Sequence, residues 1–131
     1  MAAAYFVLPR VLTVAPLEDR REYSEYSARS GKEAGWAPVQ LWWEMPPEIK
    51  GEWRAKKAAR FTLTHGEAFA GDSHVPREKI RAFLDERVSR GEIDYVVVFP
   101  TKGTKWGEIF PVLDECRKSR VKIVLLNQYE A

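Results

Sequence analysis

Residues 75–130 read VPREKIRAFLDERVSRGEIDYVVVFPTKGTKWGEIFPVLDECRKSRVKIVLLNQYE, and the spacing of their apolar residues changes along the stretch. Apolar residues recur every three or four positions after Pro76, which predicts a helix that ends near Gly91. Residues 95–99 form a continuous β-branched and aromatic run, typical of a strand covered on both faces. Helical spacing returns over 109–116, and a second apolar run follows over 121–126. This pattern predicts a right-handed βαβ unit, with its ligand site beyond the carboxyl ends of the strands.

The rest of the chain predicts shorter elements. Residues 5–14 indicate a first strand interrupted at Pro9, and a helix begins near Leu17 and continues toward Gly31 or Gly35. A short strand over 39–43, a polar helix over about 48–60 and a strand over 61–64 follow, and 65–75 is expected to be loop. The predicted fold is α/β, with a mostly parallel sheet of four or five strands and helices on both faces.

Composition limits the class of protein. The chain has 131 residues, which predicts a single domain over 1–131, and its 45% hydrophobic and 31% charged residues exclude disorder. No apolar run approaches the roughly 20 residues that cross a bilayer, and no basic region precedes the apolar start, so we expect a soluble, cytoplasmic protein without a membrane partner. The scarcity of Asn and Gln beside abundant Lys, Arg and Glu is typical of hyperthermophile proteins.

Two surface candidates lie between residues 36 and 60. Four tryptophans crowd into this region: Trp36, Trp42, Trp43 and Trp53. They form either a buried satellite core or a partner interface. The helix expected over 48–60 holds the densest positive charge of the chain, including Arg54, Lys56 and Lys57. Its cations either form a solvated helix face or approach phosphates while Trp53 stacks on a base.

The sequence gives little support for metal or cofactor chemistry. His65-Gly66-Glu67 has the H-x-E spacing of zinc deaminases, but that site needs further cysteine ligands and Cys116 is the single cysteine. Neither glycine-rich phosphate signature follows a strand, so no cofactor and no metal are predicted. Cys116 lies on the apolar face of a predicted helix, where a core thiol is favoured over a reactive one.

The segment Gly91-Glu92-Ile93-Asp94-Tyr95-Val96-Val97-Val98, preceded by an apolar helix that starts at Arg77, resembles the second half of the catalytic domain of serine recombinases, the resolvase and invertase family. Gly71-Asp72-Ser73 is similar to the family's S-G-containing loop, and Pro9-Arg10-Val11-Leu12-Thr13 is similar to its A-R-V-S-T strand. The resemblance covers about two-thirds of the chain. It implies a resolvase-like fold in which residues 36–60 are an insertion rich in tryptophan.

The departures from this family concern its chemistry. The family attacks a DNA phosphodiester with a serine, and the matching position here is Leu12, which has no nucleophilic atom. Thr13 would point to the opposite face of a strand. The family's D-R-L-G-R loop corresponds to residues 101–105, where Lys102 and Lys105 keep positive charge without the forked geometry of arginine. The resemblance therefore implies a catalytically inactive homologue, and we expect no enzyme.

Two functions follow as hypotheses. In the first, a basic cluster at the carboxyl ends of the strands, formed by Arg10, Arg77, Lys102 and Lys105 with help from the helix over 48–60, binds DNA or a phosphorylated ligand. Surface ion pairing of these cations is the alternative. In the second, the fold is a scaffold, and Trp42, Trp43 and Trp53 contact a protein partner or a second copy of the chain.

Overall fold

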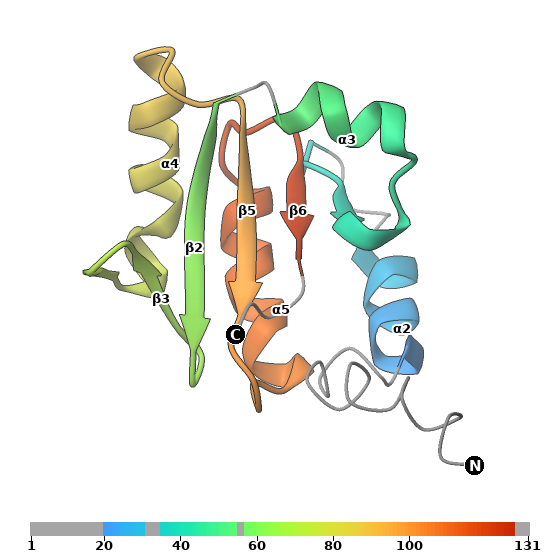
Figure 1. Cartoon of the computed structure of the whole chain (residues 1–131). Coiled ribbons are helices and arrows are strands. Elements are labelled where there is room, and N and C mark those ends of the chain that lie inside the picture. Colours follow the sequence, from blue (N-terminus) through green and yellow to red (C-terminus); the bar gives the residue numbers. More distant parts are fainter. Residues whose placement is uncertain (1–19, 31–34, 55–56, 128–131) are drawn as a thin grey trace.

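The computed structural model describes residues 20–30, 35–54 and 57–127, which form one β-sheet with helices on both of its faces (Figure 1). The strand predicted over 5–14 lies outside the described residues, together with Arg10, Leu12 and Thr13. The α/β class predicted from the sequence is confirmed.

The sheet has six strands in the order β1-β6-β5-β2-β3-β4. β1, β6, β5 and β2 pair in parallel, whereas β3 pairs antiparallel with both β2 and β4. The predicted sheet of four or five mostly parallel strands is therefore wrong, since the described residues form a larger, mixed one. The strands are β1 (Val39–Leu41), β2 (Ala58–Thr64), β3 (Glu67–Ala70), β4 (Ser73–Val75), β5 (Tyr95–Pro100) and β6 (Val124–Leu126).

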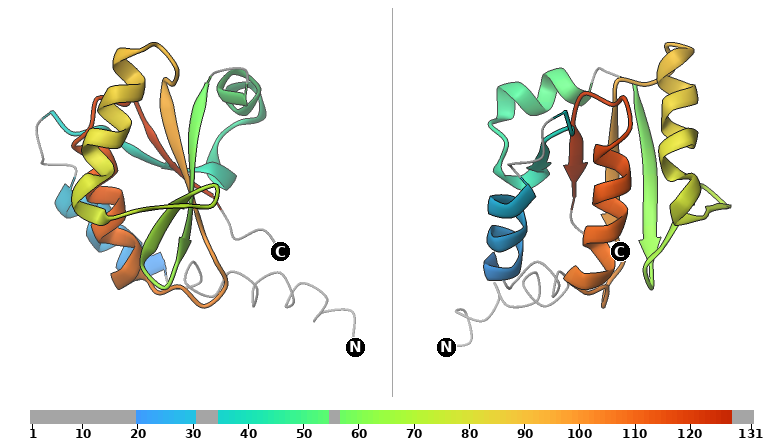
Figure 2. Two further views of the ribbon diagram at one scale, coloured as in Figure 1. Left: turned by 90° about the vertical axis from the view of Figure 1, so that its left-hand side faces the viewer. Right: turned by 180° about the vertical axis from the view of Figure 1, so that it is seen from behind.

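In the described part of the chain, four α-helices cover this sheet unequally. α2, α4 and α5 lie against one face, and α3 lies against the other (Figure 2). Their bounds are α2 Arg20–Ser30, α3 Pro47–Arg54, α4 Ile80–Ser89 and α5 Trp106–Arg117, with 3-10 turns η3 at Trp42–Glu44 and η4 at Arg77–Lys79. None of these described helices is long and apolar enough to cross a bilayer.

The βαβ unit predicted from residues 95–126 is present as β5, α5 and β6. β5 and β6 are adjacent and parallel, with Val98 opposite Leu126. The side chains of β5 are buried on both faces except for the half-buried Phe99, as expected for a strand without polar alternation. α5 supplies Ile109, Leu113 and other apolar residues to the core under the sheet.

The loop expected over 65–75 is wrong, because these residues continue the sheet as a meander. His65 and Gly66 alone connect β2 to β3, with φ of 51° and 81°, the backbone of a type I′ hairpin turn. Gly71, at φ 65°, opens the equally short turn between β3 and β4. Each turn is a pair of residues that contains glycine. Such a pair between two short runs of alternating polar and apolar residues is a recognised signal of a β-hairpin.

The polar helix expected over 48–60 is also too long. α3 ends at Arg54, and Ala58 already begins β2. Alternate residues of β2, Ala59, Phe61 and Leu63, are buried, so the strand period governs this stretch in spite of the high helix propensity of alanine. A partner strand on each side fixes the extended conformation, because β2 pairs with β5 and with β3.

Two hydrophobic cores lie on opposite faces of the sheet. The main core packs α2, α4 and α5 on the sheet and includes Cys116, which has no exposed surface. Burial raises the pKa of this thiol, so the core interpretation of Cys116 is confirmed. The second core is thin, with Met45, Tyr95, Val97 and Leu125 buried beneath the region of α3.

Candidate functional site

The carboxyl ends of β2, β5 and β6 lie at one edge of the sheet, where their arrows point in Figure 1. The β5–α5 loop, residues 101–105, crosses this edge and carries the exposed side chains of Lys102 and Lys105. Ligand sites of parallel α/β sheets lie beyond such strand ends. The structure therefore places Lys102 and Lys105 at the carboxyl ends of the strands, as predicted.

The loop that carries these lysines is pinned to the end of β2. The Thr101 N–H and hydroxyl both donate to the Leu63 carbonyl, at 2.8 and 3.0 Å, and the Thr104 hydroxyl lies 3.5 Å from the same oxygen. A turn closed by Thr104 N–H to Thr101 O at 3.1 Å places Lys102 and Gly103 at its tip. Because Thr104 is buried, the loop holds its two lysines outward from a fixed base.

Lys105 precedes the first turn of α5. Its backbone N–H donates to Glu108 Oε1 at 2.9 Å, and its carbonyl accepts from the Glu108 N–H at 2.8 Å. A carboxylate in the first turn satisfies an unpaired donor and complements the helix dipole. These contacts fix the backbone of Lys105 and leave its side chain exposed.

Arg77 lies in a cavity of about 570 Å³ between the β2–β3 turn, η4 and the start of α5. Gly107 and Glu108 line the same cavity, so Arg77 and Lys105 belong to the same end of α5. Three carboxylates, however, share this cavity with the guanidinium, and one of them, Glu67, contacts His74 at 2.6 Å. Because these carboxylates are negatively charged, the cavity is not a favourable site for an isolated phosphate. The carboxylates are those of Glu67, Glu78 and Glu108.

The basic residues near the end of α3 lie elsewhere. Lys57 precedes β2, and its ammonium group donates to the Gly91 carbonyl at 3.1 Å, at the amino end of β5. Arg54 is the last residue of α3, and Lys56 lies outside the described residues. β2 spans roughly 20 Å, so Lys57 is separated by the length of the sheet from Lys102. The predicted cations therefore do not gather into one cluster.

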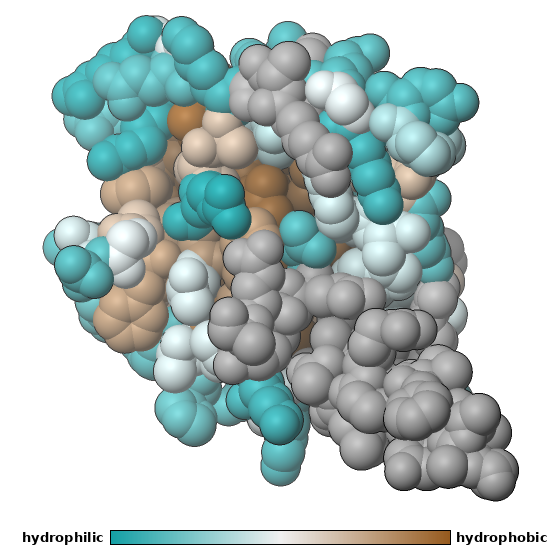
Figure 3. Space-filling view, in the orientation of Figure 1, coloured by the Kyte–Doolittle hydropathy of each residue, from teal (hydrophilic) through white to brown (hydrophobic). Residues whose placement is uncertain are grey.

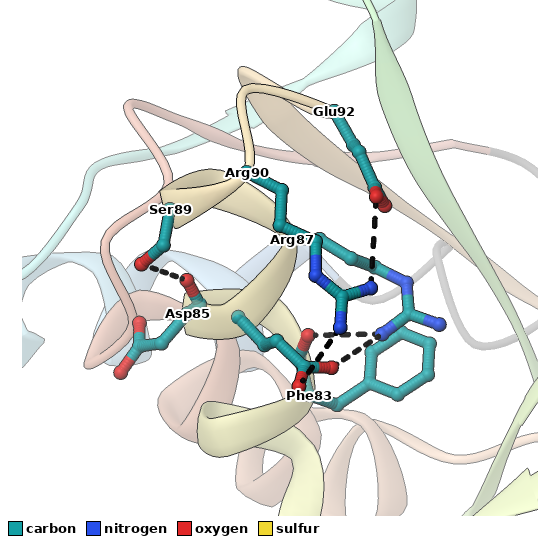
Figure 4. A network of polar contacts seen from close by, with 7 residues as sticks. Phe83, Asp85, Arg87, Ser89, Arg90 and Glu92 are labelled. Carbon is teal, nitrogen blue, oxygen red and sulfur yellow. Dashed lines mark hydrogen bonds and ion pairs between the residues drawn. The ribbon is translucent and has the colours of Figure 1, made fainter.

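Two arginines at the amino edge, Arg87 and Arg90, have partners. Arg90 lies 3.3 Å from Glu86 and 3.7 Å from Glu92, and the Arg87 guanidinium covers the ring of Phe83 at 3.6 Å (Figure 4). Lys102 and Lys105 form no ion pair with the described residues. Lys102 and Lys105 thus present positive charge at the carboxyl edge without a neutralising ion pair among the described residues.

The tryptophans of the segment 36–60 cover the sheet and contact its cores. Trp53 packs edge-on against Tyr95 with ring centroids 4.9 Å apart, and the Tyr95 hydroxyl donates to the Trp53 carbonyl. Trp42 also packs on the second core, whereas Trp43 packs on the main core. All three are half-buried. This placement fits the satellite-core interpretation, and the partner interface stays a prediction.

Arg117 is a buried residue that the sequence did not reveal. Only 4% of its surface is exposed, and its Nε donates to the Ala37 carbonyl at 2.7 Å while its own carbonyl accepts from the Ala37 N–H at 2.9 Å. Its guanidinium also lies 5.1 Å from the ring of Trp36. Arg117 therefore fixes the segment that enters β1, and its role is structural.

The H-x-E residues take no part in a metal site in the described part of the chain. His65 is an exposed turn residue, and Glu67 pairs with His74. Residues 20–30, 35–54 and 57–127 contain no group of three or more side chains able to hold a metal ion.

Comparison with protein-family models, with curated proteins and with solved structures finds no match to this chain. The resemblance to serine recombinases consequently stays a prediction, as does the role of residues 36–60 as an insertion.

Proposed function

We propose that this chain binds the phosphate backbone of DNA at the carboxyl edge of its sheet and does not cleave it. The observation that carries the proposal is the pinned loop 101–105, which presents Lys102 and Lys105 without an ion-pair partner among the described residues. Holding a loop rigid before binding reduces the entropy lost on association. Two ammonium groups on such a loop form a pre-organised contact for adjacent phosphates.

The resemblance to serine recombinases supports the choice of DNA. A degenerate, resolvase-like protein would keep backbone contacts while losing the reaction, because Leu12 occupies the position of the nucleophile. Arg77 is expected to contribute less to DNA binding than the two lysines, because carboxylates line its cavity. The contacts are to phosphate, so we expect little dependence on base sequence.

The test is fluorescence anisotropy of labelled DNA titrated with the protein over a series of salt concentrations. We expect the logarithm of the affinity to fall linearly with the logarithm of the salt concentration, and the Lys102→Ala/Lys105→Ala variant to lower that slope by about 1 to 2. Lysine contacts act chiefly through released counterions, which is why the slope is the diagnostic quantity.

A matched control removes the same charge from the opposite edge. Lys57 and Lys122 both lie beside the amino ends of strands and are exposed, so Lys57→Ala/Lys122→Ala lowers the net charge equally. We expect this control to keep most of the affinity and the slope. An equal loss in both double variants would mean that net charge, and not the loop, governs binding.

Assembly through α3 is a second candidate function. Ile49 is 41% exposed and is the large hydrophobic residue most open to solvent in the described part of the chain. Trp42 and Trp53 serve the protein's own second core, so a charged residue there would disturb the fold. Ile49→Lys is the cleaner test, and a loss of self-association in sedimentation would favour this candidate.

A further inference from the structure

The half of the sheet that α3 leaves uncovered carries a row of aromatic and polar side chains. Phe99 of β5 lies opposite Thr62 of β2, Thr62 lies opposite Phe69 of β3, and Phe69 lies opposite His74 of β4. Directly opposed residues share a face of the sheet, so these four form one row across four strands. Their sequence neighbours Leu63 and Ala68 face the main core, which places the row on the opposite face.

This row is partly open to solvent, although Phe99 also packs against the second core. Thr62 and His74 are exposed, and both phenylalanine rings are half-buried. In the space-filling view, hydrophobic side chains reach the surface over β2 and β3 with polar side chains among them (Figure 3). The solvated face of a sheet is normally polar, so two aromatic rings on this face suggest that a binding partner covers it.

Positive charge lies beside the rings. Arg60, two residues before Thr62 on the same face of β2, is exposed, and its guanidinium carbon lies 4.6 Å from the centroid of the Phe99 ring. Arg60 therefore adds positive charge to the face of the sheet that carries the two rings. Glu67, two residues before Phe69 on β3, is hydrogen-bonded to His74.

From this juxtaposition we propose that this partly exposed sheet face binds single-stranded DNA, whose bases stack on Phe69 and Phe99. The inference rests on the proposed function, since the lysines of loop 101–105 supply the backbone contacts at the end of the same strands. Partly exposed aromatic rings can stack on the faces of bases, which a duplex hides within its own stack. Single strands are therefore the form of DNA that fits the row.

The experiment compares a single-stranded oligothymidine of about 12 nucleotides with a duplex of the same length, by anisotropy at several salt concentrations. Phe69→Leu and Phe99→Leu keep apolar volume and remove the flat ring. We expect each to weaken single-strand binding by roughly 5- to 100-fold at every salt concentration. The salt slope and the affinity for duplex DNA should remain unchanged, because stacking releases few counterions.

Phe83→Leu is the matched control. Phe83 is also half-buried and also lies beneath an arginine, but it belongs to α4 and packs on the main core (Figure 4). This variant should bind single strands like the unmodified protein. Circular dichroism and thermal unfolding of each variant establish that the fold is retained.

Other outcomes separate the two proposals. Unchanged single-strand binding by Phe69→Leu and Phe99→Leu, with a lower slope in Lys102→Ala/Lys105→Ala, overturns the stacking inference and leaves the proposed function standing. Equal losses on single-stranded and duplex DNA also overturn it. An oligouridine that binds far more tightly than oligothymidine overturns the choice of DNA. Absence of all binding at the lowest salt concentration overturns both proposals.

Discussion

Two side chains of the main core are kept neutral by their surroundings. The pKa of Tyr26 lies above its ordinary value of 10.0, first because the ring is buried and second because its hydroxyl donates to Asp114 Oδ1 at 2.7 Å. Burial likewise raises the pKa of Cys116 above 9.0. Neither group ionises in the folded protein at the pH at which it ionises in the unfolded chain.

This difference predicts a loss of stability in alkali. A raised pKa in the folded state gives stability that is complete below the unfolded pKa and is lost as the pH rises above it. We therefore expect the free energy of unfolding to fall between about pH 8 and pH 10.5, by roughly 1.4 kcal/mol per group for each pH unit above its unfolded pKa. Urea unfolding at the two pH values measures it.

Tyr26→Phe is the control for the alkaline effect. The variant should lose about 1 kcal/mol near neutral pH, because Asp114 loses a hydrogen bond, and should show a shallower fall in alkali. An identical pH dependence in the variant would exclude Tyr26 as a source of the effect.

At the scale of the elements, the turns of the β2–β3–β4 meander decide how the edge of the sheet is built. Gly71 adopts φ 65° in open surroundings, with no atom within 4 Å of an added Cβ. A larger residue at this position would strain the backbone but would not clash with neighbouring atoms. Gly51 lies in α3, and an added Cβ there also meets nothing within 4 Å.

These two glycines predict opposite effects of the same substitution. Gly71→Ala should lower the free energy of unfolding by about 1–2 kcal/mol, because alanine disfavours positive φ. Gly51→Ala should raise it by about 0.5–1 kcal/mol, because alanine is the better helix former. Chemical denaturation of both variants measures the pair. A stabilising Gly71→Ala would contradict the turn geometry.

The whole molecule is asymmetric about its sheet. Among the described residues, α2, α4, α5 and most of the buried side chains lie on one face, whereas α3 and four buried residues form the core of the other. Stability against local opening follows buried apolar contact, so the side of α3 should open first.

Native-state hydrogen exchange tests this asymmetry. We expect the amides of α3 and η3 to exchange at least about 10-fold faster than those of α5 and β5, since their opening releases only the thin second core. Exchange from α3 as slow as that from α5 would show that the molecule opens as one unit. Bound single-stranded DNA should slow exchange in β2 and β3 if the stacking inference is correct.

Local patterns in the sequence carried the parts of the fold that depend on near neighbours. The unbroken apolar run of β5 and the helical spacing of α5 predicted the βαβ unit, and the apolar position of Cys116 predicted its burial. Lys102 and Lys105 were placed at the strand ends because a parallel unit leaves only one edge for its ligand. The glycine-containing pairs at Gly66 and Gly71 are hairpin signals in the sequence, but the prediction of a loop over 65–75 did not use them.

What the sequence by itself determined is therefore the α/β class, the βαβ unit and the edge that carries the loop lysines, because periodicity over ten or so residues encodes which faces are buried. The tertiary structure alone decided that residues 58–60 extend the strand predicted over 61–64 into a central strand, that Arg117 is buried against Ala37, and that Phe99, Thr62 and Phe69 lie in one row. These features depend on strand order and register, which pair residues distant in the chain and leave no mark in local spacing.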